Sequence, residues 1–325
     1  MNTLHVNIGL ARYSDWAFTS AVVALVVALL LLAFELAYVG ARRADQRARV
    51  LAGAVTADSS APGIVEDEPQ RPFDERVGRA GLAVVYLGIG LLLTCIVLRG
   101  LATVRVPWGN MYEFINLTCM CGLVAGAIVL RRPQYRPLWV FLLLPVLILL
   151  TVSGRWLYTN AAPVMPALQS YWLPIHVSVV SLGSGVFLVA GIASILFLLR
   201  TSKLGDPEAE GALARIVQRF PDAQTLDRIA YRTTIFAFPV FGFGVIFGAI
   251  WAEEAWGRYW GWDPKETVSF IAWVVYAAYL HARSTAGWRD RKAAWINVVG
   301  FVAMVFNLFF VNLVTVGLHS YAGVG

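Results

Sequence analysis

Charged residues are scarce in this sequence, since Asp, Glu, Lys and Arg together make up only 14% of its 325 residues. A soluble domain usually carries about 25% charged residues, so the composition excludes an ordinary water-soluble globule. Hydrophobic residues instead make up 58% of the chain. No basic stretch is long enough to form a nucleic-acid groove, so no nucleic-acid partner is expected. The net charge of +6 is instead interpreted as a signal of membrane topology. The composition therefore indicates an integral membrane protein.

Cysteine is also scarce, and its placement excludes two classes of redox protein. The three cysteines, Cys95, Cys119 and Cys121, all lie within apolar runs. The chain has no Cys-x-x-Cys, so it is not expected to be a thiol-disulfide carrier, and without Cys-x-x-Cys-His it is not itself a c-type cytochrome. We interpret the three residues as small buried hydrophobic side chains.

The sequence also lacks short segments in which apolar and polar residues alternate. Such segments are the pattern of an outer-membrane β-barrel. The apolar residues form long runs, and an α-helix needs about 20 such residues to cross a bilayer. The sequence predicts an all-α, polytopic integral membrane protein with about eight transmembrane helices. The predicted spans are residues 16–39, 80–98, 111–130, 138–152, 173–199, 233–251, 267–282 and 293–318.

The distribution of Lys and Arg among the connections predicts the orientation of these spans. If the N-terminus lies outside, the inner segments hold 20 basic residues and the outer segments hold 6. Inner loops of membrane proteins carry the excess of positive charge. Both termini are therefore expected on the outer side, which is periplasmic or otherwise extracytoplasmic.

We divide the chain into two parts on this basis. Residues 1–79 hold the first transmembrane helix and a cytoplasmic linker at 51–76, which has too little apolar sequence to fold and is expected to be flexible. Residues 80–325 form one membrane domain. Within it, residues 207–230 alternate apolar and charged positions, which is typical of a short interfacial helix.

Histidine occurs four times, and three of the four lie at span ends. His5 lies in a short tail that is expected outside, and we assign it no role. His176 and His319 are expected on the outer side of the membrane and His281 on the inner side. Each could be an interfacial residue with a hydrated tip. Each could also be a ligand, because ionisable residues at membrane depth are often functional and neutral imidazole is a common axial ligand of heme iron. Two outer histidines on separate spans could bind opposite faces of one heme.

The densest motif lies between the outer histidines in sequence, at residues 251–267. Tryptophan commonly lines the membrane interface, but one or two residues per span end suffice for that purpose. A cluster of this size, with glycines between the rings, suits a planar apolar macrocycle, and Arg258 or Lys265 is available for its carboxylates. The aromatic members are Trp251, Trp256, Tyr259, Trp260 and Trp262.

Asp263 begins the sequence Asp-Pro-Lys-Glu, which is typical of a helix start. Capping the next span would explain Asp263 and Glu266 without any chemistry, and it leaves room for a second role at a ligand. His281 follows 18 residues later, or roughly 27 Å along a helix, close to the thickness of the hydrocarbon layer. If both ends of this span contact heme, they do so on opposite sides of the membrane, which implies two heme sites or a route between them.

These motifs together resemble the tryptophan-rich "WWD" family of heme-handling proteins in cytochrome c maturation. The rest of the chain is similar to the CcsA/ResC type, the heme-handling subunit of the system II cytochrome c synthase. The resemblance covers most of the chain from about residue 80 onward. The segments that carry it are PWGNMYE (107–113), LQSYWLPIH (168–176), LDRIAY (226–231), WGRYWGWDPKET (256–267), YLHAR (279–283) and GLHSY (317–321).

The resemblance implies a role for each candidate residue. His176 and His319 match the two external histidines that ligate iron of heme b at the outer site, and His281 matches an inner histidine that ligates heme on its way in. The aromatic residues, Arg258 and Asp263 match the WWD segment that holds the macrocycle. The implied activity is holocytochrome c synthase (heme lyase) activity in complex with a ResB/CcsB-type partner. Reduced heme is joined to Cys-x-x-Cys-His of an apocytochrome c, with a thioredoxin-like protein as a candidate thiol reductant. The implied location is a bacterial cytoplasmic membrane or, in a plastid, the thylakoid membrane.

Two other functions remain open from the sequence. A heme exporter or chaperone would use the same sites without ligation chemistry. A diheme electron-transfer subunit usually pairs four histidines on facing helices, but here a single inner histidine is present, so a partner would have to supply the fourth.

Overall fold

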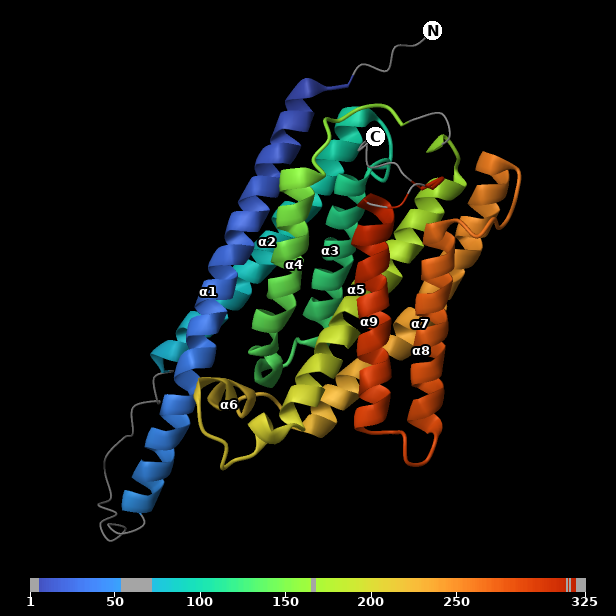
Figure 1. Cartoon of the computed structure of the whole chain (residues 1–325). Helices are drawn as coiled ribbons and strands as arrows, with labels where there is room; N and C mark the ends of the chain where they lie inside the picture. The colour runs from blue at the N-terminus through green and yellow to red at the C-terminus, as the bar shows by residue number, and fades with distance from the viewer. Residues whose placement is uncertain (1–5, 54–71, 165–167, 314, 316, 320–325) are drawn as a thin grey trace.

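The computed structural model describes residues 6–53, 72–164, 168–313, 315 and 317–319 (Figure 1). All regular elements in these described residues are helices. The long helices are α1 (Ile8–Gly53), α2 (Phe73–Thr103), α3 (Met111–Val129), α4 (Leu138–Trp156), α5 (Trp172–Arg200), α7 (Ala223–Trp256), α8 (Pro264–Ser284) and α9 (Arg291–Leu313). The short α-helix α6 (Ala212–Val217) lies between α5 and α7.

Seven of these helices are long and apolar enough to cross a membrane, which confirms the prediction of a polytopic all-helical membrane protein. They are α1 over Ile8–Tyr38, α2, α3, α4, α5, α7, and α9 over Arg291–Val311. The remaining predicted span, residues 267–282, lies inside α8. With 21 residues α8 is about 31 Å long, which is a membrane-spanning length, but it is more polar than the other seven.

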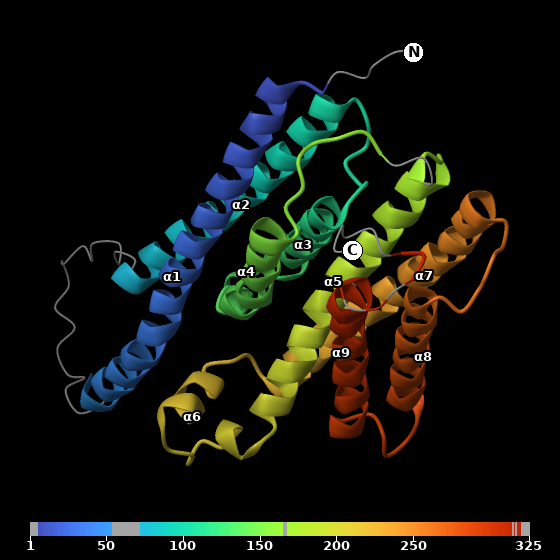
Figure 2. The same ribbon diagram turned by 45° about the horizontal axis from the view of Figure 1, so that its top comes forward.

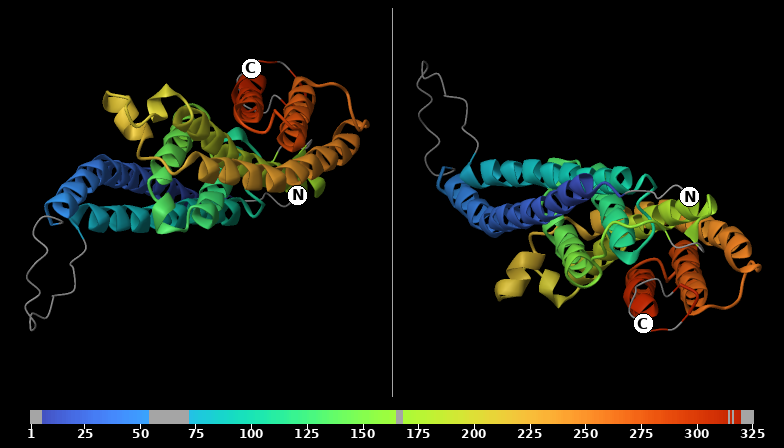
Figure 3. Two further views of the ribbon diagram at one scale, coloured as in Figure 1. Left: turned by 90° about the horizontal axis from the view of Figure 1, so that it is seen from below. Right: turned by 90° about the horizontal axis from the view of Figure 1, so that it is seen from above.

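The helices form an elongated bundle in which long helices that follow one another in the sequence run antiparallel (Figure 1). In Figure 2, α1 and α2 pair along one flank, α5 crosses the centre against α7, and α8 and α9 pair along the other flank. The two end-on views of Figure 3 place α3 and α4 between these flanking pairs. The start of α1 and the end of α9 lie at the same end of the bundle (Figure 1). That this end faces outward stays a prediction from the Lys and Arg counts.

Small residues allow the central helices to approach closely. A Cβ at Gly185 of α5 would lie 2.5 Å from the backbone nitrogen of Gly122 in α3, and one at Gly183 would lie 2.9 Å from Cβ of Phe241 in α7. Close backbone approach at small residues is the usual packing mode of transmembrane helices, since lipid provides little hydrophobic drive between them. These contacts fix α5, which carries one of the candidate histidines, at the centre of the bundle.

Parts of the segments predicted as a linker (51–76) and as an interfacial helix (207–230) belong to the long helices. Residues 51–53 end α1 and residues 73–76 belong to α2, while 54–71 lie outside the described residues. Of the predicted segment 207–230, Ala212–Val217 forms α6 and the part from Ala223 onward already belongs to α7. The α7 helix begins where Asp222 accepts a hydrogen bond from the Thr225 backbone N–H.

Candidate functional site

The tryptophan-rich segment forms the turn that joins α7 to α8. Helix α7 ends at Trp256, and Gly257 follows with φ = 69°, a left-handed conformation that favours glycine. The Gly257 N–H donates to the Glu253 carbonyl at 2.8 Å, which closes the last turn of α7. Helix α8 then begins after Asp263. The chain therefore reverses direction within residues 257–263 and presents its aromatic rings at this end of the bundle.

Asp263 has both of the roles that its sequence context left open. As the N-cap of α8 it takes part in a capping box, in which the Glu266 carboxylate accepts a hydrogen bond from the Asp263 N–H at 3.1 Å. The same Asp263 side chain accepts hydrogen bonds from Nδ1 of His319 at 2.8 Å and from the Leu318 N–H at 2.7 Å. Gly317 leaves room for the carboxylate, since a Cβ there would lie 2.6 Å from Oδ1. One carboxylate thus starts α8 and holds the segment that follows α9.

The electrostatics of this pair define the tautomer of His319. Burial alone would raise the pKa of Asp263, but the hydrogen bonds from His319 and Leu318 outweigh it and hold this pKa below its ordinary value. Burial lowers the pKa of His319, and the neighbouring Asp263 opposes that shift without reversing it. The carboxylate is ionised and only accepts, so neutral His319 donates from Nδ1 and keeps Nε2 unprotonated. An unprotonated Nε2 is the form that ligates a metal.

His176 reaches the same tautomer through a backbone contact. It lies near the start of α5, and its Nδ1 is 2.8 Å from the carbonyl oxygen of Gly244 in α7. A carbonyl only accepts, so Nδ1 carries the proton and Nε2 does not. Gly248 lets α7 pass close to the ring, since a Cβ there would lie 2.6 Å from Cε1 of His176. His176 and His319 are therefore each oriented by a contact at Nδ1, as is usual for metal-binding imidazoles.

Two of the five aromatic candidates contact the histidines directly. Trp251 is buried and stacks on His176, with ring centroids 6.0 Å apart and planes 12° apart. Trp251 also meets His319 edge to face at 5.9 Å, and Trp256 meets His319 at 5.1 Å. Trp256 in turn packs against Trp251 at 4.8 Å. These two indoles therefore pack against the imidazoles and do not form an exposed surface on which a macrocycle could lie.

The other three aromatic residues lie in the exposed part of the turn. Tyr259 and Trp262 are 62% and 67% exposed, and Trp262 adopts φ = 57°, which is uncommon for a residue with a side chain. Trp260 packs edge to face against Trp262 at 5.7 Å. Tyr259 and Trp260 line the cavity that both histidines border. They therefore form part of the wall of this cavity.

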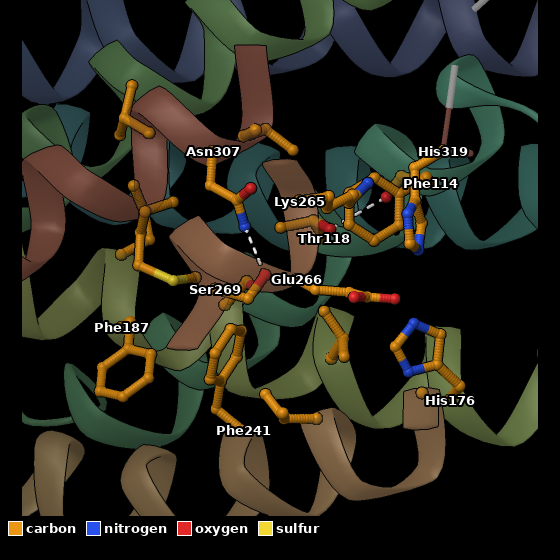
Figure 4. A pocket seen from close by; sticks show the side chains of 18 of the residues that line it. Phe114, Thr118, His176, Phe187, Phe241, Lys265, Glu266, Ser269, Asn307 and His319 are labelled. Atoms are coloured by element: carbon orange, nitrogen blue, oxygen red, sulfur yellow. Dashed lines mark hydrogen bonds between the residues drawn. The ribbon is translucent and has the colours of Figure 1, made fainter. Parts of the chain in front are cut away.

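His176 and His319 both border two adjoining cavities. The larger contains about 990 Å³ of space, with open solvent at its mouth included, and its walls are mostly apolar side chains of α3, α5, α7, α8 and α9. Figure 4 shows the two imidazoles at one side of this cavity and Phe187 and Phe241 at the other. The smaller cavity, about 580 Å³, extends from the same histidines toward Trp108 and Asn110.

The structure separates the two cationic candidates for a carboxylate. Lys265 lines both cavities, and its Nζ lies 5.2 Å from the centre of the Phe114 ring. It lies just before the predicted span 267–282, and burial lowers the pKa of Lys265 to about 8. Arg258 instead packs its guanidinium against Gly261 within the turn. Lys265 is therefore the cation that faces the cavity.

His281 lies far from this site, in the last turn of α8 at the opposite end of the bundle (Figure 1). Its side chain is exposed, and its backbone carbonyl accepts hydrogen bonds from Ser284 and Thr285. Nearby, Arg283 and Asp227 form an ion pair at 2.6 Å that joins α8 to α7. The structure therefore places His281 apart from His176 and His319, as its spacing from Asp263 predicts.

A buried cluster of charges that the sequence analysis did not identify supports the site from α2 and α3. Glu113 accepts hydrogen bonds from Nε of Arg99 at 3.0 Å, from Nη1 of Arg105 at 2.9 Å and from the Gly109 N–H at 2.7 Å. The turn so held carries Trp108, whose Nε1 donates to Oγ of Ser178 on α5 at 2.9 Å. The motif at 107–113 is a sequence signal of this arrangement, although the ion pairs are not visible from spacing.

Comparison with known proteins gives consistent matches along most of the chain. A family model described as Cytochrome C assembly protein matches residues 108–319. Cytochrome c biogenesis protein CcsA of Gloeobacter violaceus is 34% identical over 298 residues, covering 77% of this chain and 87% of that protein. CcsA of Guillardia theta is 35% identical over 260 residues, covering 73% of this chain and 86% of that protein.

A solved structure shares the fold. The cytochrome c heme lyase CcmF matches with a TM-score of 0.61 over 92% of this chain at 17% identity. The match covers 46% of the CcmF chain, so this protein corresponds to about half of that larger one. At this level of identity the similarity concerns the arrangement of helices.

Proposed function

This chain belongs to the cytochrome c assembly protein family and is of the CcsA type, and from that premise we propose that it is the heme-handling subunit of a system II cytochrome c synthase. It is a multi-pass membrane protein of a bacterial or thylakoid membrane. In this proposal His176 and His319 bind the iron of reduced heme b from opposite faces, and the bound heme is the substrate of the reaction.

The observation that carries the proposal is the matched orientation of the two imidazoles. Each has its Nδ1 engaged, His176 with the Gly244 carbonyl and His319 with Asp263, and each borders the same apolar cavity. Two neutral imidazoles are a common axial pair for heme iron. Histidines that only lay at the membrane interface and did not bind heme iron would need neither a hydrogen bond at Nδ1 nor a shared cavity.

The remaining cavity residues fit the rest of the macrocycle. The apolar walls suit the porphyrin ring, and Tyr259 and Trp260 line the same cavity. Lys265 supplies a cation for a propionate, and the contact would be a charge-assisted hydrogen bond. The proposed heme site therefore uses Lys265 for the carboxylate, while Arg258 stabilises the turn.

The chemistry of attachment needs positioning more than it needs reactive protein groups. A thiol of Cys-x-x-Cys-His in apocytochrome c adds across each heme vinyl group. A C–S bond forms, the thiol proton passes to the terminal vinyl carbon, and no net electrons are exchanged. The reactive sulfurs belong to the apocytochrome, so Cys95, Cys119 and Cys121 can lie in helices α2 and α3. Holding the vinyl groups of heme next to the thiols of the peptide can by itself account for a large part of the acceleration of this reaction.

The proposal includes three partners and an inner site. His281, exposed at the opposite end of α8, would ligate incoming heme together with a residue from a ResB/CcsB-type subunit. Apocytochrome c would bind at the histidine end, and a thioredoxin-like reductant would keep its thiols reduced. Heme lyase activity is expected from the complex and not from this chain alone.

An attachment assay tests the function. The chain is co-expressed with a ResB-type partner and an apocytochrome reporter, and covalent heme on the reporter is measured for wild type, His176→Ala and His319→Ala. We expect both variants to lose attachment and added imidazole to restore it. Attachment at the wild-type level in both variants would contradict the proposal, and heme binding without attachment in the wild type would favour a heme exporter.

A further inference from the structure

Hydrogen-bond donors from three different helices border the smaller cavity, and the first is Trp251 of α7. Its indole is 2% exposed and lines this cavity, and its Nε1–H has no acceptor among the described residues. The apolar side chains of Leu168, Leu173 and Val177 pack in one cluster with this indole. A buried donor without a partner is costly, so we expect its acceptor to come from a molecule that fills the cavity.

The second source of donors is the start of α3, which reaches this cavity at Asn110 and Met111. The first turn of a helix leaves backbone N–H groups without a partner inside the helix. Asn110 accepts from the Glu113 N–H at 2.9 Å, whereas the N–H groups of Met111 and Tyr112 have no acceptor among the described residues. Such N–H groups, together with the helix dipole, favour an anion at this end of α3.

Lys265 of α8 is the third donor, and it lies close to the start of α3. Its Nζ is 5.2 Å from the ring centre of Phe114, a residue in the first turn of α3. Phe114 also packs against the cluster that contains Trp251. Trp251, Lys265 and the start of α3 are therefore grouped around one phenyl ring and border the same cavity.

The described residues that line this cavity include no acidic side chain. The nearby carboxylates have contacts elsewhere, since Glu113 accepts from Arg99 and Arg105. Asp263 accepts from the segment after α9, and Glu266 accepts from backbone N–H groups of the tryptophan-rich turn. The donors therefore face a space into which none of the carboxylates of the described chain projects.

Resting on the proposed function, we infer that the smaller cavity is the binding pocket for a carboxylate of heme. Its donors are Nε1 of Trp251, Nζ of Lys265 and the N–H groups at the start of α3. A carboxylate only accepts hydrogen bonds, and each of these groups only donates. Lys265 lines both cavities, so a propionate can extend from a macrocycle in the larger cavity into the smaller one.

This pocket would set the orientation of heme within its own plane. The propionates and the vinyl groups lie on different edges of the macrocycle, so a fixed propionate also fixes where the vinyl groups point. Attachment depends on holding those vinyl groups next to the thiols of the peptide. The pocket thus gives Trp251 a hydrogen bond to the ligand in addition to its packing on the imidazoles.

Binding of heme and of heme dimethyl ester, in which both carboxylates are blocked, tests the pocket. The full chain is purified in detergent with its ResB-type partner, and every protein carries His281→Ala so that the outer site alone is titrated. The readout is the preference for heme over its ester, and comparing this preference between variants cancels the partition of each heme into detergent. Trp251→Phe removes the Nε1–H and keeps an aromatic ring. We expect its preference for heme to fall about tenfold, as for the loss of one hydrogen bond to a charged group.

A second variant tests the start of α3 without removing a side chain. Asn110→Asp retains the N-cap, because Asp caps as well as Asn, and places a negative charge beside the proposed carboxylate. We expect the preference for heme to fall about tenfold here too, with binding of the ester close to that of the parent protein.

Each variant has a matched control. Trp139→Phe corresponds to Trp251→Phe, because Trp139 is also buried with an Nε1 that lacks a partner among the described residues, yet it lines neither cavity. Gln169→Glu corresponds to Asn110→Asp, because it adds the same charge on an exposed side chain just before α5. Both controls should keep the preference of the parent protein.

The outcomes separate this inference from the proposed function. Equal weakening of heme and its ester by Trp251→Phe would mean that the indole acts through packing, and would overturn its role as a donor. An unchanged preference in Asn110→Asp, or an equal fall in its control, would overturn the pocket at the start of α3. If the proposed function failed instead, the parent protein would lack a six-coordinate bis-imidazole spectrum with either heme.

Discussion

Asp263 and His319 lie 56 positions apart in the sequence, yet Oδ2 of Asp263 is 2.8 Å from Nδ1 of His319. The same carboxylate caps α8 and binds the backbone of Leu318. A single side chain thus links the tryptophan-rich turn to the segment after α9. This arrangement resembles the carboxylate–histidine pairs that orient metal-binding imidazoles.

The two roles of Asp263 can be separated by substitution. Asp263→Ala removes both the cap and the acceptor for His319, and losing an N-cap costs about 1 kcal/mol of stability. Asp263→Asn keeps the cap and removes only the charged acceptor. We expect the thermal midpoint to fall in the Ala variant and to stay near wild type in the Asn variant, while both weaken the ligation of heme by His319. A midpoint that falls equally in both variants would show that the charge, and not the cap, stabilises this end of α8.

The lowered pKa of His319 predicts a loss of stability in acid. The native state favours neutral His319, because burial holds its pKa below the ordinary value of 6.5. Below pH 6.5 the unfolded chain therefore binds more protons at this position, and the stabilisation present above that pH is lost as pH falls toward the native pKa. His319→Gln should lose less stability than wild type between pH 7.5 and 5.5, measured by thermal unfolding of the heme-free proteins. An equal loss in both would mean that other groups govern the acid range.

Lys265 is predicted to recognise a heme carboxylate, whereas Arg258 is not. Lys265→Met should weaken heme binding by about tenfold, in line with the loss of one charge-assisted hydrogen bond. It should have little effect on binding of heme dimethyl ester, which has no free carboxylate. Arg258→Met should bind both hemes with similar affinity to wild type, because its guanidinium packs on Gly261. If Lys265→Met weakened both hemes equally, Lys265 would be acting through packing.

The tryptophans are predicted to divide into structural and ligand-contacting residues. Trp251 is 2% exposed and packs on both imidazoles, so Trp251→Ala should destabilise the protein by about 3–5 kcal/mol as well as abolish heme binding. Trp262 is exposed, so Trp262→Ala should leave the unfolding midpoint unchanged and reduce heme attachment to the reporter. Unfolding and attachment measured on the same preparations distinguish these effects. A large loss of stability in Trp262→Ala would contradict the division.

The membrane spans were predictable because the hydrocarbon layer requires apolar residues over the length of a span. The helices, however, extend beyond the ends of the apolar runs. Helix α7 begins at Ala223 although its apolar run begins near residue 233, and α1 continues to Gly53 through several arginines. Charged residues such as Arg are good helix formers, so a helix continues past the point where hydropathy falls. The start of α8 was better predicted, because Asp263 and Glu266 form a local motif that depends on neighbouring residues only.

The candidate site was predictable in its residues but not in its contacts. Resemblance to the WWD family pointed to His176 and His319, whereas no spacing in the sequence indicates that the Gly244 carbonyl and Asp263 orient them. The choice between Arg258 and Lys265 likewise depended on how the turn folds. Such contacts are set by the packing of helices that are distant in sequence, and local patterns contain no information about them.

The absorption spectrum of reduced heme in the purified complex reports whether His176 and His319 both ligate the iron. We predict a six-coordinate, low-spin spectrum for wild type and for His281→Ala at the outer site, and a five-coordinate spectrum or loss of heme for His176→Ala and for His319→Ala. Added imidazole should restore the six-coordinate spectrum in both outer variants. If either of these two variants, combined with His281→Ala to remove the proposed inner site, kept a six-coordinate spectrum without imidazole, its histidine would not be an axial ligand of the heme.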